Sequence, residues 1–217
     1  MFQEVPGGML HYQQWGSGPP LILLHGNGED LTIFNEAAQV LSERFCVYAL
    51  DLPGHGRSHR PQVLHYRHIA QAIRSFIRSL GLDKPYLYGF SDGGIIGLML
   101  AIDSPHLLSK LVISGANLEP EGLRLFTRMR TAVRCRLTGS EKAQMMLSEP
   151  YISTQSLGSI TVPTFVTAGQ FDCIKPAHTR LIAASIPGSR LDIFPGQLHG
   201  SYVVHSQKIA QYLLSVL

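Results

Sequence analysis

Short, uninterrupted apolar runs recur along this chain, and longer segments of helical periodicity separate them. Tyr66–Leu80 is one such segment, with its apolar residues on a single stripe of a helix. Short apolar runs are typical of parallel strands buried on both faces. Their alternation with amphipathic helices predicts βαβ repetition and therefore an α/β sheet. The expected strands are Leu21–Leu24, Cys46–Leu50, Tyr86–Phe90, Leu111–Ser114, Thr164–Ala168 and Arg190–Phe194.

Both ends of the chain extend this pattern. Met9–Trp15 alternates with period two after a Pro-Gly-Gly turn, which predicts an antiparallel hairpin at the start of the sheet. Ser201–Leu217 is expected to form a closing helix. The 217 residues, 45% of them hydrophobic, suffice for one sizeable core, so we expect a single domain.

Composition argues against several classes of protein. No stretch is apolar enough to span a membrane, and Met1–Gly8 lacks the features of an export signal. The three cysteines, Cys46, Cys135 and Cys173, are odd in number and lack metal-ligand spacing, which favours reduced thiols in the cytoplasm. The net charge of +3 is too mild to indicate a nucleic-acid partner.

A G-x-S-x-G pentapeptide, Gly89–Gly93, joins one expected strand to an apolar, helix-like segment. A sharp strand-to-helix reversal would hold Ser91 in a strained backbone and leave no room for side chains at positions 89 and 93. This context predicts a nucleophilic serine. The pentapeptide alone is weak, because the chain holds 21 glycines. The alternative is a glycine-rich turn in which Ser91 caps the helix.

Polar residues follow the other expected strands, where ligands of open α/β sheets bind. These segments are His25–Gly28, Asp51–Ser58, Gly115–Asn117, Gly169–Asp172 and Pro195–Gly200. Ser91, Asp172 and His199 therefore come at three strand ends. Taken singly, Asp172 and His199 are equally compatible with ordinary loop residues.

The order Ser91, Asp172, His199 resembles that of the α/β-hydrolase family, and the similarity covers nearly the whole chain. Gly89–Ile95 and Ile113–Asn117 are most similar to valacyclovir-hydrolase-like esterases. The resemblance implies one domain, 1–217, with a mostly parallel eight-stranded sheet flanked by helices. It also implies a short helical cap over about 118–159, and no metal or organic cofactor.

The same resemblance implies roles for the site residues. Ser91 would attack the substrate, His199 would accept its proton, and Asp172 would orient the imidazole. The backbone N–H groups of Asn27 and Asp92 would form the oxyanion hole. His25 would shape the oxyanion loop without transferring protons.

Other residues allow rival assignments. The acid could follow the preceding strand, but Gly115–Asn117 offers no carboxylate, so Asp172 is preferred. Asp51, His55 and Ser58 could form a second site, although a tight turn explains their segment better. Two histidine pairs have spacings that suit a metal but lack further ligands, namely His55 with His59 and His65 with His68.

Substrate choice would reside in the cap. Phe126 and Met129, which recur at helical spacing with Leu123 and Val133, could line an acyl pocket; the alternative is a face that packs on the domain. Five arginines, Arg124, Arg128, Arg130, Arg134 and Arg136, would favour anionic substrates or simply form a solvated face.

The expected activity is hydrolysis of a small or medium carboxylic ester, a small-molecule substrate, through an acyl-enzyme. The same residues could serve a thioesterase, lactonase, amidase or carbon–carbon bond hydrolase. A ligand-binding or receptor-like relative with little turnover is the alternative from another class.

Overall fold

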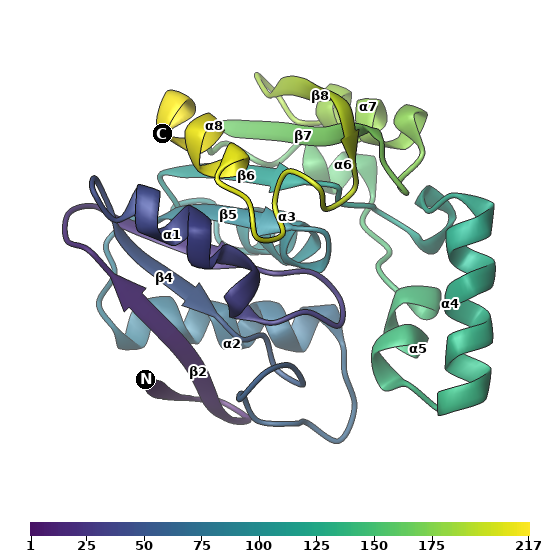
Figure 1. Ribbon diagram of the computed structural model, residues 1–217, viewed down its shortest axis with the longest axis horizontal. Helices are drawn as coiled ribbons and strands as arrows, with labels where there is room; N and C mark the ends of the chain where they lie inside the picture. The colour runs from purple at the N-terminus through teal and green to yellow at the C-terminus, as the bar shows by residue number, and fades with distance from the viewer.

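The computed structural model describes residues 1–217 and is built around one eight-stranded sheet (Figure 1). The strands are β1 (Phe2–Val5), β2 (Gly8–Trp15), β3 (Pro20–Leu24), β4 (Cys46–Leu50), β5 (Tyr86–Phe90), β6 (Lys110–Ser114), β7 (Thr164–Phe171) and β8 (Arg190–Leu198). Every apolar run expected to be a strand lies within one of them.

The sheet is mostly parallel, in the order β1-β2-β4-β3-β5-β6-β7-β8. Only the β1–β2 and β2–β4 pairs are antiparallel, and β1 and β2 form the hairpin that the alternation in Met9–Trp15 predicts. Leu24 pairs with Gly89, and Phe90 pairs with Ser114. The carboxyl ends of β3, β5 and β6 therefore meet at one edge of the sheet, and the residues that follow them are brought together.

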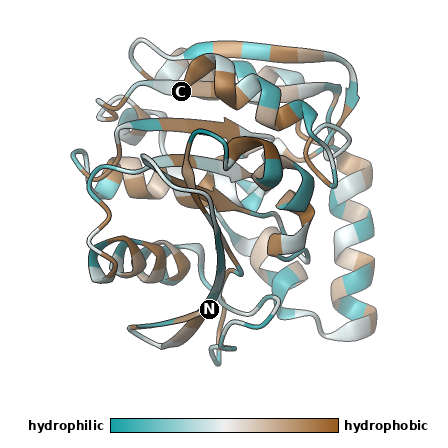
Figure 2. Ribbon diagram, turned by 60° about the vertical axis from the view of Figure 1, so that its left-hand side comes forward, coloured by the Kyte–Doolittle hydropathy of each residue, from teal (hydrophilic) through white to brown (hydrophobic).

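Helices cover both faces of the sheet. Together with two 3₁₀ segments, η1 (Leu31–Phe34) and η2 (Pro120–Gly122), they are α1 (Asn35–Leu41), α2 (Tyr66–Ser79), α3 (Asp92–Asp103), α4 (Leu125–Thr138), α5 (Glu141–Ser148), α6 (Thr154–Leu157), α7 (Pro176–Ser185) and α8 (Lys208–Val216). The core on one face includes residues of α1 and α8, and the core on the other includes residues of α2, α3 and α7. Figure 2 shows hydrophobic residues concentrated on the central strands.

The closing helix is shorter than the sequence predicts, because it begins at Lys208 and not at Ser201. His205 adopts a left-handed backbone conformation (φ 49°), which interrupts a helix, and its N–H bonds Ile33 O at 2.9 Å. Tyr202 and Val203 belong to the turn before this helix, and both are fully buried in the core. His199 lies between the end of β8 and this turn.

The segment between β6 and β7 divides into two parts. Helices α4 and α5 stand together at one end of the sheet, away from its main body (Figure 1). Helix α6 instead packs on α3 and α7, and Leu157 is fully buried in the core. The part of 118–159 that is separate from the main body thus consists chiefly of α4 and α5. None of the helices has the length and hydrophobicity that crossing a membrane requires.

Candidate active site

Ser91 lies on a sharp turn between β5 and α3. Its backbone has φ 53° and ψ −114°, a conformation that side-chain-bearing residues rarely adopt. A Cβ on Gly89 would lie 2.2 Å from Gly93 O, and one on Gly93 would lie 2.2 Å from Leu24 O. Glycine is therefore required at both positions, as the pentapeptide predicts.

The structure brings Ser91, His199 and Asp172 into one line of contacts. His199 Nε2 lies 3.1 Å from Ser91 Oγ, and His199 Nδ1 lies 2.7 Å from Asp172 Oδ1. Asp172 also accepts hydrogen bonds from the backbone N–H of Ile174 at 2.8 Å and of Gly169 at 3.4 Å. The carboxylate is thus fixed by the loop after β7, and it fixes the imidazole in turn.

The charges of this pair support each other. Burial is the largest single effect at Asp172 and raises the pKa of this carboxyl, but the hydrogen bond and charge of His199 and the N–H groups of Ile174 and Gly169 together hold the pKa below its usual range. At His199 burial is again the largest single effect and lowers the pKa, but the hydrogen bonds and charges of Asp172 and Cys173 together raise the pKa of the imidazole above its ordinary value. The pair is therefore suited to stabilise an imidazolium.

Two backbone donors beside Ser91 are free. The N–H groups of Asn27 and Asp92 have no acceptor within the protein, and both residues line the same cavity as Ser91. Asp92 is the first residue of α3, where N–H groups lack partners within the helix. These are the two backbone N–H groups that are expected from the sequence to form an oxyanion hole.

The loop that carries Asn27 is held by His25. The imidazole Nδ1 donates to Gly26 O at 2.8 Å, and Nε2 accepts from the Leu52 N–H at 3.0 Å. Burial lowers the pKa of His25 to about 4, so the ring is neutral at physiological pH. The structure thus gives His25 the loop-shaping part expected from the sequence.

The side chain of Asn27 connects this loop to α3 and to the cap. Its amide nitrogen donates to Asp92 Oδ2 at 3.0 Å and to Lys142 O at 3.1 Å, while its oxygen accepts from Arg134 at 3.1 Å. Asp92 also accepts from the Tyr66 hydroxyl at 2.8 Å. No residue-pattern signal in the sequence points to this network.

The segment Asp51–Ser58 forms a tight turn rather than a second site. Asp51 accepts backbone hydrogen bonds from Leu31 and Arg57, and Ser58 Oγ donates to Asp51 O. Gly56 has φ 49°, and a Cβ there would lie 2.2 Å from the Asp51 carboxylate. These contacts engage the side chains of Asp51 and Ser58 in holding the turn, and His55 Nδ1 lies 3.1 Å from Pro53 O within the same turn.

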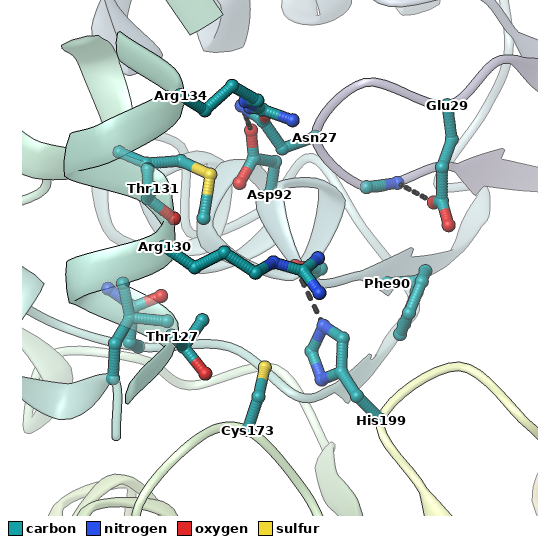
Figure 3. Close-up of a pocket in the computed structure, with 15 residues that line it drawn as sticks. Asn27, Glu29, Phe90, Asp92, Thr127, Arg130, Thr131, Arg134, Cys173 and His199 are labelled. Atoms are coloured by element: carbon teal, nitrogen blue, oxygen red, sulfur yellow. Dashed lines mark hydrogen bonds between the residues drawn. The ribbon is translucent and has the colours of Figure 1, made fainter. Parts of the chain in front are cut away.

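A cavity of about 230 Å³ opens beside the triad, between the sheet edge and α4 (Figure 3). Only 4 of its 15 lining residues are hydrophobic. Leu123, one of the possible pocket residues considered from the sequence, lines the cavity. The remaining lining residues are Gly26, Asn27, Glu29, Phe90, Ser91, Asp92, Asn117, Thr127, Arg130, Thr131, Arg134, Met146, Cys173 and His199. Burial raises the pKa of both carboxyl groups in the wall, Glu29 and Asp92.

The structure places the expected pocket residues Phe126 and Met129 outside this cavity. They are 75% and 60% exposed and, with Val133, lie on a largely exposed face of α4. The side of α4 that borders the cavity instead carries Thr127, Arg130, Thr131 and Arg134. The apolar periodicity of this segment predicts that Phe126 and Met129 line the cavity. The side of α4 that borders the cavity is polar, so a search for apolar residues does not find it.

Three metal-type donor groups gather at one place only, at Asp172, Cys173 and His199, whose ligand atoms lie within 4.8 Å of one another. Two of these residues, Asp172 and His199, are already hydrogen-bonded to each other. The histidine pairs considered from the sequence gain no third ligand of this kind.

Comparison with known proteins agrees with this geometry. Residues 19–134 match the family model for the alpha/beta hydrolase fold. The chain is 35% identical over 103 residues to pimeloyl-[acyl-carrier protein] methyl ester esterase of Vibrio parahaemolyticus, covering 48% of this chain and 39% of that one. It is 26% identical to the enzyme of that name from Vibrio cholerae over 94% of this chain and 96% of that one.

Other curated relatives at similar identity are also matched over about two fifths of their own length. Among solved structures, the enol-lactonase from Burkholderia xenovorans LB400 superposes with a TM-score of 0.82 at 18% identity, covering 99% of this chain and 98% of that one. With its mostly parallel sheet, its serine turn and its family match, this chain belongs to the alpha/beta hydrolase fold family and has esterase-type relatives.

Proposed function

We propose that this chain is a serine hydrolase that cleaves a small or medium carboxylic ester through an acyl-enzyme. The observation that carries the proposal is the contact line from Ser91 through His199 to Asp172, beside two free backbone N–H groups. The nucleophile, the base and the oxyanion donors would thus line one cavity, and the orienting acid would contact the base from behind.

Acylation begins when Ser91 Oγ attacks the ester carbonyl carbon while His199 Nε2 takes the hydroxyl proton. The carbonyl oxygen becomes an oxyanion, which the N–H groups of Asn27 and Asp92 stabilise. Asp172 stabilises the imidazolium without accepting a proton itself. When the intermediate collapses, the bond to the alcohol oxygen breaks, and the alcohol leaves with the proton from His199.

Deacylation repeats these steps with water. His199 Nε2 removes a proton from a water molecule, whose oxygen attacks the acyl carbonyl carbon. The second oxyanion faces the same two N–H groups, and Ser91 leaves with the proton that His199 returns. The carboxylic acid is released, and the resting serine is restored.

The size of the cavity supports a small or medium acyl group. Its volume of about 230 Å³ is below the roughly 300–1,000 Å³ typical of pockets for drug-sized ligands. The Vibrio cholerae relative, matched over nearly its full length, is named as an esterase of a methyl ester. An ester with a small alcohol group is therefore the first substrate to test.

A fluorophosphonate probe tests the serine directly, because it labels only an activated hydroxyl. The wild-type chain should be labelled, whereas Ser91→Ala and His199→Ala should not. Ser79→Ala, at an exposed serine at the end of α2, is the matched control and should label normally. Failure of a folded wild-type chain to label would contradict the proposal and favour the ligand-binding alternative.

A substrate panel then identifies the bond that is cleaved. p-Nitrophenyl acetate and butyrate should be hydrolysed, and loss of Ser91 should lower the rate by about three orders of magnitude or more. Faster turnover of matched acyl-thioesters, lactones, amides or carbon–carbon substrates would replace the ester assignment with the corresponding alternative.

A further inference from the structure

Arginine side chains from the cap enter the wall of the catalytic cavity. Thr127, Arg130, Thr131 and Arg134 follow one another at helical spacing, so they share one side of α4. Figure 3 shows the side chain of Arg130 reaching from α4 into the pocket that His199 and Phe90 border. The cavity therefore has positively charged groups on its cap side, facing the nucleophile.

Arg130 lacks an acidic partner in the protein. The arginine ion pairs of the molecule join Arg128 to Glu121 and Arg190 to Asp192. Arg134 is different from Arg130, because it donates a hydrogen bond to the Asn27 side chain. Among the arginines of the cavity wall, Arg130 is thus the one whose guanidinium is free for a ligand.

The carboxyl groups of the cavity wall are bonded to residues other than Arg130. Glu29 Oε2 accepts from the Gly26 N–H at 2.9 Å, and Asp92 accepts from Asn27 and Tyr66. Neither carboxyl group forms an ion pair with Arg130, so its charge has no partner in the protein. The cavity therefore favours a ligand that brings a negative charge.

The lining also disfavours a long alkyl chain. Thr127, Thr131 and Asn117 line the same cavity as Arg130, and hydrophobic residues make up 4 of its 15 lining positions. A guanidinium binds a carboxylate through two parallel N–H···O bonds, so a planar carboxylate is the anion that suits it best.

We propose that the natural substrate is an anionic ester, in which a short chain joins the scissile ester to a carboxylate held by Arg130. This inference rests on the proposed hydrolase function and names its substrate class. The carboxylate would hold the chain between α4 and Ser91, and would thereby present the carbonyl carbon to Ser91 Oγ. Arg130 is a substrate-binding residue in this scheme.

Matched esters test the proposal. Monomethyl glutarate carries a carboxylate on the acyl side, and dimethyl glutarate is its neutral counterpart; 4-acetoxybutyrate and its methyl ester place the same charge on the alcohol side. For at least one pair, the wild type should show a kcat/KM at least tenfold higher for the anionic member. A preference for monomethyl glutarate would place the carboxylate on the acyl side of the natural ester, and a preference for 4-acetoxybutyrate would place it on the alcohol side. Equal or better turnover of both neutral esters would overturn the proposal.

Variants show whether Arg130 is responsible. Arg130→Gln should lower kcat/KM for the preferred anionic ester at least tenfold more than for its neutral counterpart, and Arg130→Lys should restore part of the preference. Arg136→Gln removes an exposed arginine of the same helix that lies outside the cavity, so it should keep the wild-type ratio. Equal losses for both esters in Arg130→Gln would contradict a charge-specific role.

Binding without turnover separates this proposal from the hydrolase assignment. Titration of Ser91→Ala with glutarate in a calorimeter should give a weaker Kd, by about tenfold, when Arg130→Gln is added. If the fluorophosphonate probe fails on the wild type but glutarate binding still depends on Arg130, the hydrolase assignment is wrong and the anion site stands. If the probe labels Ser91 but Arg130 affects neither binding nor preference, only the substrate class is wrong.

Discussion

A β-carbon on Gly115 would stand 2.6 Å from Cε1 of His199. Gly115 follows β6 directly and has φ +61°, so its backbone passes beneath the imidazole. Asp172 Oδ2 would lie 3.3 Å from the same added carbon. Gly115, at the end of β6, therefore contributes to the site although it carries no carboxylate. The absence of a side chain at Gly115 leaves space for the imidazole ring of His199.

Gly115→Ala should lower kcat/KM at least tenfold by displacing His199 from Ser91. Gly139→Ala is a matched control, because Gly139 has φ +62° and no atom within 4 Å of an added Cβ. Both substitutions should cost a similar backbone strain, about 1–2 kcal/mol, measured by chemical denaturation. Equal activities in the two variants would show that contact with the imidazole does not matter.

The rate should depend on the protonation of His199. Only the neutral imidazole can accept the Ser91 proton, so kcat/KM should rise with pH through the pKa of His199. Burial opposes the imidazolium, but Asp172 and Cys173 together outweigh it and raise this pKa, which places the midpoint above 6.5. A pH profile measured with a neutral ester gives the midpoint.

Asp172→Asn removes the negative charge and should move that midpoint to lower pH. The rate should also fall by orders of magnitude, because an amide does not hold the imidazole in the productive tautomer. Fluorophosphonate labelling at several pH values gives the same midpoint independently of turnover. An unchanged midpoint in Asp172→Asn would argue against Asp172 as the partner of His199.

Asn27→Ala should reduce activity only about tenfold, because the oxyanion donor at this position is a backbone N–H that the substitution retains. Loss of an oxyanion donor itself costs about 10²–10³ in kcat. The expected residual loss comes from the side-chain bonds of Asn27 to Asp92, Lys142 and Arg134, which hold the loop. Measurement of kcat/KM for the wild type and Asn27→Ala shows whether the loss is about tenfold or as large as that expected for a lost oxyanion donor. A loss above 10³-fold would contradict the prediction and would mean that the Asn27 side chain itself is needed for activity.

The sheet was predictable because its strands are buried on both faces, and burial leaves a continuous apolar run in the sequence. The Ser91 turn was predictable for a similar reason, since close backbone packing permits only glycine at positions 89 and 93. The order of Ser91, Asp172 and His199 followed from the positions of the strand ends. In the buried strands and at positions 89 and 93, a single local requirement, burial or close backbone packing, decides the residue type.

The cap wall was not predictable in the same way. The choice between the Phe126 and Thr127 sides of α4 depends on how the helix docks over the sheet edge, and periodicity in the sequence carries no information about docking. The stripe that includes Phe126 and Met129 remains exposed, against the usual preference for burial. Arg130 and Thr131 carry a weak signal, as they share a helix face with Thr127 and Arg134, but only the fold shows that this face borders Ser91.

A thiol reagent should inactivate the enzyme through Cys173. The three cysteines are free and half-buried, but only Cys173 lines the catalytic cavity, with Sγ within 4.8 Å of donor atoms of His199 and Asp172. Methyl methanethiosulfonate adds a methylthio group, which would occupy the space beside the imidazole. Ester hydrolysis should therefore be lost as the reagent reacts, and dithiothreitol should restore it.

Single substitutions identify the reacting thiol. Cys173→Ser should stay active and resist the reagent, because its hydroxyl does not react with a methanethiosulfonate. Cys46→Ser leaves Cys173 in place, so that variant should be inactivated at the wild-type rate. A substrate that fills the cavity should slow inactivation of the wild type, since it would cover the thiol. Inactivation of Cys173→Ser at the wild-type rate would place the sensitive group elsewhere, with Cys135 on α4 the next residue to replace.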